Sequence, residues 1–153
     1  AWLEPRCPIL NIRDTPEKII HFKSWNAESF YFNDPAGNIL EFIVHHDLAN
    51  GKPGPFGSEH ILWQSEIGLV VPDVPAAEDV IEDALGLTPY RPGSPVFSAV
   101  GDTRGLLILV KRGRIWLPTT DVPADVFPTE VTLGGSAGGM LSFDGLPYRV
   151  ESR

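Results

Sequence analysis

One segment of this chain joins a tight turn to a strand with a carboxylate in its middle: Asp34-Pro35-Ala36-Gly37-Asn38-Ile39-Leu40-Glu41-Phe42. The Asp-Pro pair opens a turn, and the glycine that follows supplies the left-handed backbone needed where the chain leaves it. Residues 39–44 are apolar on both faces apart from Glu41, which predicts a strand covered on both sides. Because an unpaired buried charge is very costly, we expect Glu41 to meet a metal ion, a cation or water in a cleft.

Composition places the chain among ordinary globular proteins. Its 153 residues are 42% hydrophobic and 21% charged, which suits one domain or two small fused modules. The 20 acidic and 12 basic residues give a net charge of −8. This charge argues against nucleic acid and anionic membrane as partners, because both demand clustered Lys and Arg. Cys7 is the only cysteine, so no intrachain disulfide can form and a reducing cytoplasm is the expected location.

Runs of β-branched and aromatic residues predict a series of short strands. A stretch rich in glycine and proline, 49–63, predicts a connector between two groups of strands. The glycine-rich segment 134–139 predicts a flexible hairpin rather than a phosphate-binding loop, because it lacks the Gly-Lys-Ser/Thr ending. The predicted strands are 19–25, 29–32, 39–44, 66–71, 96–100, 106–110, 129–133 and 148–151.

One helix is predicted over residues 74–85. Asp73 can cap its N-terminus, and Pro75 suits the first turn, where a missing N–H costs nothing. Gly86 suits the position after the last turn. We expect Glu78 and the neighbouring acidic residues to face water. The predicted apolar stripe is Val80, Ile81, Ala84 and Leu85.

With these elements in place, the sequence resembles the vicinal oxygen chelate superfamily, which groups glyoxalases, bleomycin-resistance proteins and extradiol dioxygenases. The family mark Asp-Pro-x-Gly-Asn-x-Leu-Glu is matched at 34–41 without a gap, and an aromatic run at 30–32 precedes it. A family repeat commonly opens His-Val-x-Leu-x-Val-x-Asp before its helix. Residues 66–73 agree with that opening, except that Glu66 stands where histidine is usual.

The resemblance implies an α+β protein in which paired βαβββ modules form an open, cup-shaped sheet. In this chain the first module would lack its opening strand and helix, leaving its C-terminal part at 1–48, a connector at 49–63 and the second module at 64–153. The second module also lacks the Asp-Pro-x-Gly-Asn mark. We therefore expect either a fragment or a homodimer in which a partner copy supplies the missing half.

The resemblance also implies a divalent metal (Mn, Fe, Zn, Ni or Mg) held by side chains from the first and last strands of the repeats. Glu41 takes the last-strand ligand position, and Glu66 takes the first-strand position. His45 lies on the same strand face as Glu41 by parity, which makes it a third candidate ligand. Without a metal, Glu41 in an apolar cleft would have a raised pKa and could act as a general base.

Two functions stay open at this point. One is a metal-dependent lyase or dioxygenase acting on a small molecule, with Glu41 in the catalytic role. The other is a metal-free protein of the bleomycin-resistance type that sequesters a small molecule, an alternative favoured by the missing histidine at position 66. Glu41 could also simply line a wet cleft, and adjacent histidines such as His45 and His46 are often solvated at a strand end.

Overall fold

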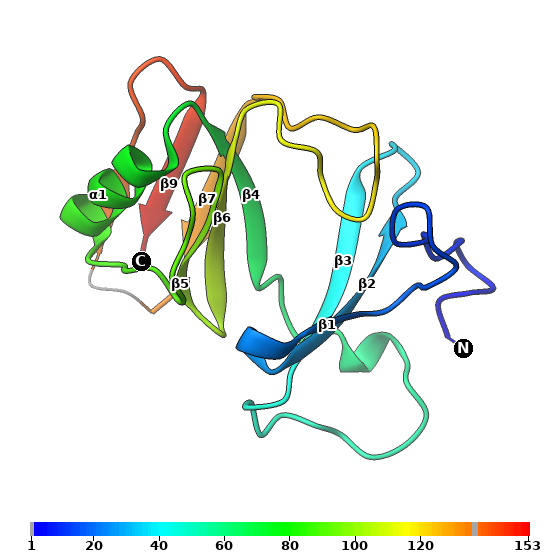
Figure 1. The fold of residues 1–153 in the computed structure, drawn as a ribbon. Helices are drawn as coiled ribbons and strands as arrows, with labels where there is room; N and C mark the ends of the chain where they lie inside the picture. The colour runs from blue at the N-terminus through cyan, green and yellow to red at the C-terminus, as the bar shows by residue number, and fades with distance from the viewer. Residues whose placement is uncertain (1, 136–137) are drawn as a thin grey trace. The chain divides into compact units, whose positions relative to one another are not determined.

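The computed structural model describes residues 2–135 and 138–153, and the chain divides into two compact units. Unit 1 takes the chain up to Trp63 together with Ile115–Val122, and unit 2 takes Gln64–Arg114 and the chain from Pro123 onward. The described residues hold three open, three-stranded sheets and one α-helix, which confirms the predicted α+β class (Figure 1). Residues 136 and 137 of the predicted glycine-rich hairpin lie outside the described residues.

Unit 1 is built on one antiparallel sheet of strand order β1-β2-β3. The strands are β1 (Ile20–Phe22), β2 (Ala27–Asn33) and β3 (Ile39–His45). β2 and β3 form the hairpin around the predicted turn, in a register that sets Asn33 opposite Ile39 and Tyr31 opposite Glu41. Aromatic rings pack on the other face of this hairpin, where Phe42 lies 5.6 Å from Phe30 and 6.1 Å from Phe56 between ring centroids.

The turn between β2 and β3 is held by the side chain of Asp34. Its Oδ1 accepts the backbone N–H groups of Ala36 at 2.9 Å and Asn38 at 2.8 Å, and its Oδ2 accepts the Asn38 side-chain amide at 2.8 Å. These hydrogen bonds, the one from the Asn38 side chain foremost, lower the pKa of Asp34 below its ordinary value. Gly37 adopts φ 87°, as the turn prediction requires.

The strand predicted at 19–25 is shorter than expected. β1 ends at Phe22, and Lys23–Trp25 form a 3₁₀ turn, η1. Asn26 then adopts a left-handed conformation with φ 47°, and its N–H bonds the Lys23 carbonyl at 3.3 Å. Asparagine tolerates this conformation, so a tight turn replaces the end of the predicted strand.

Unit 2 contains two mixed sheets. In the first, β4 pairs in parallel with β6, which also pairs antiparallel with β5; in the second, β7 pairs in parallel with β9, which pairs antiparallel with β8. The predicted strands are found within one or two residues of their expected bounds, and β8 is an addition. The strands are β4 (Glu66–Val71), β5 (Phe97–Asp102), β6 (Gly105–Lys111), β7 (Thr129–Leu133), β8 (Gly139–Leu141) and β9 (Tyr148–Ser152).

Helix α1 (Val74–Leu85) has the predicted bounds and caps. Asp73 Oδ1 accepts the N–H of Ala76 at 3.1 Å, and Gly86 is left-handed with φ 67°. The predicted apolar stripe is wrong in half of its members, because Val80 and Ala84 are exposed. Since the first turn starts at a buried valine, the stripe runs at spacings of three and four from that residue. The buried residues of α1 are Val74, Ala77, Ile81 and Leu85.

The core of unit 2 lies between α1 and the strands of both its sheets. α1 packs against β5, β6 and β8. The buried residues of this core include Leu69, Val100, Leu107 and Leu109 from the first sheet, and Val150 from the second. No helix in the described part of the chain is long and apolar enough to cross a membrane.

Candidate functional site

Glu41 occupies the middle of β3, as the sequence predicted. Tyr31 on β2 lies directly opposite it, and Ser29 lies two residues further along β2 on the same face. Ser29 and Tyr31 are both buried, and Glu41 is partly buried. The hairpin therefore gathers one carboxyl and two hydroxyl groups on one face of the unit 1 sheet.

Burial is the main influence on the Glu41 carboxyl group. Desolvation raises the pKa of Glu41 above its ordinary value, and the hydroxyl groups of Ser29 and Tyr31 offset part of that rise by favouring the ionised form. Neither Glu41 Oε1 nor Ser29 Oγ completes a hydrogen bond of ordinary geometry within the described residues. Glu41 thus has one buried oxygen, Oε1, without a hydrogen bond in the described residues, and the hydroxyl groups of Ser29 and Tyr31 lie beside its carboxyl group.

The raised pKa also fixes how Glu41 affects stability. A carboxyl group whose pKa is higher in the folded than in the unfolded state favours folding when it is protonated. Its contribution is complete below the ordinary pKa and is lost as the pH rises through the raised value. Above the raised pKa, the ionised Glu41 therefore works against the folded state, as expected of a group kept for a purpose other than stability.

His45 ends β3 and is buried, with 5% of its surface exposed, so the expectation of a solvated histidine is wrong for this residue. Its ring stacks on Trp25 at 6.2 Å between centroids with 16° between the planes. Desolvation lowers the pKa of His45, which keeps the imidazole neutral at physiological pH. His46, the next residue, is exposed.

Glu41 and His45 share a face of β3 but are separated along it. At about 3.3 Å per residue, four residues place their backbones about 13 Å apart. Side chains stand roughly perpendicular to a sheet, so the strand itself does not bring the two groups together. Of the two, Glu41 is the residue with polar neighbours suited to a ligand.

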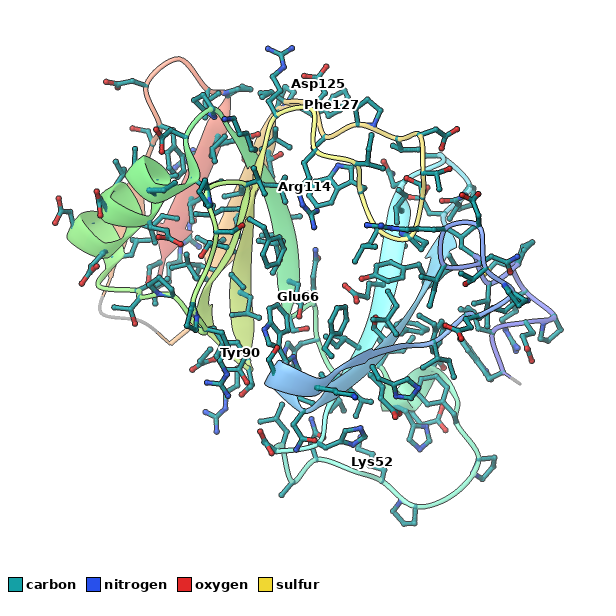
Figure 2. The ribbon with its side chains drawn as sticks, viewed as in Figure 1. Lys52, Glu66, Tyr90, Arg114, Asp125 and Phe127 are labelled. Atoms are coloured by element: carbon teal, nitrogen blue, oxygen red, sulfur yellow. The ribbon has the colours of Figure 1, made fainter. Side chains whose placement is uncertain are left out.

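Glu66 belongs to unit 2, where it is the first residue of β4 and pairs in register with Leu106 on β6 (Figure 2). The Leu106 N–H also bonds the carbonyl of Ser65 at 2.8 Å, which fixes the start of the strand. The Glu66 side chain is partly buried. The sequence therefore predicted correctly that this carboxylate opens a strand, and its role as a ligand stays a prediction.

Unit 1 also contains a second cluster of polar side chains, which the sequence did not predict. His21 Nδ1 lies 2.9 Å from Glu28 Oε1, and His46 Nε2 lies 3.8 Å from Glu28 Oε2. All three side chains are largely exposed, so these contacts are weak. The direct pairing of His21 with Glu28 follows from the register of β1 and β2, which the sequence alone did not reveal.

No group of three or more His, Cys, Asp or Glu side chains is arranged to hold a metal ion within residues 2–135 and 138–153. Comparison of the chain with models of known protein families gives no match, and a search of curated proteins gives no significant relative. Assignment of a function therefore depends on the residues themselves and on the motif resemblance.

Proposed function

We propose that this protein handles a small molecule through the carboxyl group of Glu41, as a metal-dependent enzyme of the glyoxalase or dioxygenase type. The observation that carries the proposal is the buried Glu41 oxygen, which lacks a hydrogen-bond partner in the described structure. Buried polar groups are normally satisfied, so this oxygen needs a partner, and a bound metal ion or substrate group would supply one. The family mark at 34–41 gives the same residue the role of metal ligand.

The donor set of unit 1 fits a divalent cation in part. Glu41 supplies a carboxylate oxygen, the donor that Mg, Mn and Fe favour. Burial keeps the imidazole of His45 neutral, but its backbone lies about 13 Å along β3 from that of Glu41, so His45 is proposed as a ligand on strand parity alone. A bound cation would lower the pKa of Glu41 and so remove the cost of ionising it. Glu66 is proposed as a further ligand on the resemblance alone.

When bound, such a metal would polarise a substrate carbonyl or hold a pair of substrate oxygens. The residues of the chain have separate tasks. In the absence of a metal, Glu41, with its raised pKa, can instead take a proton from a carbon or hydroxyl group of the substrate and return it. Tyr31 and Ser29, both on β2, lie beside the Glu41 carboxyl group. Their hydroxyl groups can donate hydrogen bonds that orient the carboxyl group or the substrate.

Metal binding by Glu41 is tested by titrating metal-stripped protein with Mn²⁺ and with Zn²⁺. We expect the Glu41→Ala variant to bind at least about tenfold more weakly, as losses of metal-site groups typically do. Glu28→Ala is the matched control, because Glu28 is a carboxylate of the same sheet that is largely exposed. Glu66→Ala tests the second ligand separately. Unchanged affinity in a folded Glu41→Ala protein would remove Glu41 from the metal site.

The second candidate is a metal-free protein that sequesters a small molecule. The raised pKa of Glu41 favours it, because a neutral carboxylic acid both donates and accepts hydrogen bonds and so can hold a polar ligand without a cation. Catechol binding to metal-stripped protein, followed by amide NMR, separates the two candidates. Binding that needs no metal but is lost in Glu41→Ala selects this second function.

Three further parts belong to the proposal. They are the organisation in paired βαβββ modules, a homodimer and a cytoplasmic location. The element order of unit 2, in which a strand, a helix and an antiparallel pair follow one another, supports the first of these. The single cysteine supports the last.

A further inference from the structure

The outer edge of β3 carries backbone groups that no other part of the described chain binds. β3 is an edge strand of the unit 1 sheet, whose strand order is β1-β2-β3 (Figure 1). At one end of the β2–β3 ladder, the Asp34 N–H bonds the Asn38 carbonyl at 3.0 Å. At the other end, the His46 N–H bonds the Asn26 carbonyl at 2.9 Å. Because the ladder alternates, the residues of β3 that bond β2 are the even-numbered ones between these ends, 40, 42 and 44.

The odd-numbered residues of β3 direct their backbone groups away from β2. Ile39, Glu41 and Ile43 each present an N–H and a C=O at the outer edge, and these groups make no hydrogen bond within the described residues. His45 has the same orientation, but it is buried and its carbonyl accepts the Leu48 N–H at 3.1 Å. The open part of the edge therefore runs from Ile39 to Ile43 and is symmetric about Glu41.

The residues of this open edge suit a second copy of the same strand. An unpaired edge is a template for another strand, and β3 contains neither Lys nor Pro, which commonly block such pairing. Antiparallel pairing about Glu41 would set Ile39 of each copy opposite Ile43 of the other, so each open N–H and C=O would meet a partner. On the other face, Leu40 is 41% exposed and would lie opposite the partner subunit's Phe42, an aliphatic–aromatic pair of the kind that stabilises a sheet.

We propose that two copies of this chain pair through β3, antiparallel about Glu41, and that the two Glu41 carboxyl groups bind one divalent cation between them. Residues directly opposite each other in an antiparallel pair have Cβ atoms about 4.5–5.5 Å apart, so the two partly exposed Glu41 side chains lie next to each other. Two carboxylates at this separation repel each other, whereas a divalent cation attracts both. The pairing rests on the role proposed above for Glu41 and brings a second carboxylate to that site.

Disulfide cross-linking tests the register of the two strands. Glu41→Cys and Ile39→Cys, each in a Cys7→Ser background, are treated with the thiol oxidant diamide and separated on a non-reducing gel. We expect a covalent dimer of Glu41→Cys without added metal, because the pairing sets position 41 opposite itself at a Cα separation that suits a disulfide. Ile39→Cys should stay monomeric, because position 39 lies opposite position 43, about 13 Å along the strand from its own copy.

Sedimentation velocity of the full chain, with and without Mn²⁺, tests the part played by the cation. We expect Mn²⁺ to strengthen self-association of the unchanged protein by about tenfold or more, the size of typical couplings between two binding events. Glu41→Gln removes the repulsion and the metal ligand together, so it should associate equally with and without Mn²⁺. Ile43→Pro should stay monomeric under both conditions, because proline lacks the N–H that the open edge offers.

Thr132→Pro is the matched control for Ile43→Pro. Thr132 lies on β7, an edge strand of unit 2, and directs its N–H away from β9. The self-association of Thr132→Pro should therefore equal that of the unchanged protein.

Three results would overturn the proposal. They are covalent dimer at equal levels in Glu41→Cys and Ile39→Cys or in neither, self-association that Mn²⁺ does not change, and a dimer of Ile43→Pro as strong as that of the unchanged protein. If Ile43→Pro does not fold, the cross-linking pair decides the matter. A monomer whose Mn²⁺ binding is lost in Glu41→Ala would overturn the pairing and leave the function proposed above standing.

Discussion

Replacing Ile81 by alanine is expected to lower the free energy of unfolding of unit 2 by about 2–5 kcal/mol. Ile81 has no exposed surface and belongs to the core between α1 and the strands. Truncation removes buried apolar atoms and leaves a cavity that the close-packed surroundings fill only in part. Urea denaturation followed by far-UV circular dichroism measures the change.

The matched control is the neighbouring residue on the same helix. Val80 is 41% exposed, so Val80→Ala should change stability by less than about 0.5 kcal/mol, and the better helix propensity of alanine offsets the lost contacts. This pair tests the corrected apolar stripe of α1. If Val80→Ala were as costly as Ile81→Ala, the helix would present a different face to the core.

Replacing Tyr148 by phenylalanine is expected to destabilise unit 2 by about 2–4 kcal/mol, because two buried backbone groups lose their partner. The Tyr148 hydroxyl donates to the Val70 carbonyl at 2.8 Å and accepts the Val70 N–H at 3.0 Å. β4 is an edge strand of its sheet, so this hydroxyl from β9 stands in for a neighbouring strand. Burial also raises the pKa of Tyr148, which keeps the hydroxyl protonated.

Ser152→Ala is the control for Tyr148→Phe. Ser152 lies on the same strand and is buried, but its hydroxyl makes no hydrogen bond within the described residues. Removing that hydroxyl should be neutral or slightly stabilising. Equal losses of stability in the two variants, measured by urea denaturation, would show that the Val70 hydrogen bonds do not join the two sheets.

Elements set by local chemistry were predictable from the sequence. Asp73 and Gly86 marked the two ends of α1, and Asp34 with Gly37 marked the β2–β3 turn, because caps and turns depend on residues a few positions apart. The side of α1 that packs against the core was not predictable in the same way. Valine at position 80 and isoleucine at position 81 are equally apolar, and only the packing of distant strands selects Ile81 for the core.

The candidate site was predictable in part for the same reason. The position of Glu41 within a strand followed from its neighbours in the sequence. The expected cover on both faces of that strand was wrong, because Leu40 and Val44 are exposed. Its pairing with Tyr31 could also have been found, because a turn centred on 34–38 sets the register of a hairpin and places the two residues opposite each other. The burial of His45 depends on contacts between segments far apart in the chain, and no local pattern reports it.

The ionisation of Glu41 offers the sharpest check on its proposed role, and it can be followed through the side-chain carboxyl carbon by NMR across a pH titration with and without Zn²⁺. Without metal we expect a pKa above the ordinary value, because burial disfavours the charged form. With Zn²⁺ we expect that pKa to fall markedly, because a bound cation favours the carboxylate. A Glu41 pKa in the ordinary range that does not change when Zn²⁺ is added would contradict the assignment of Glu41 as the functional group.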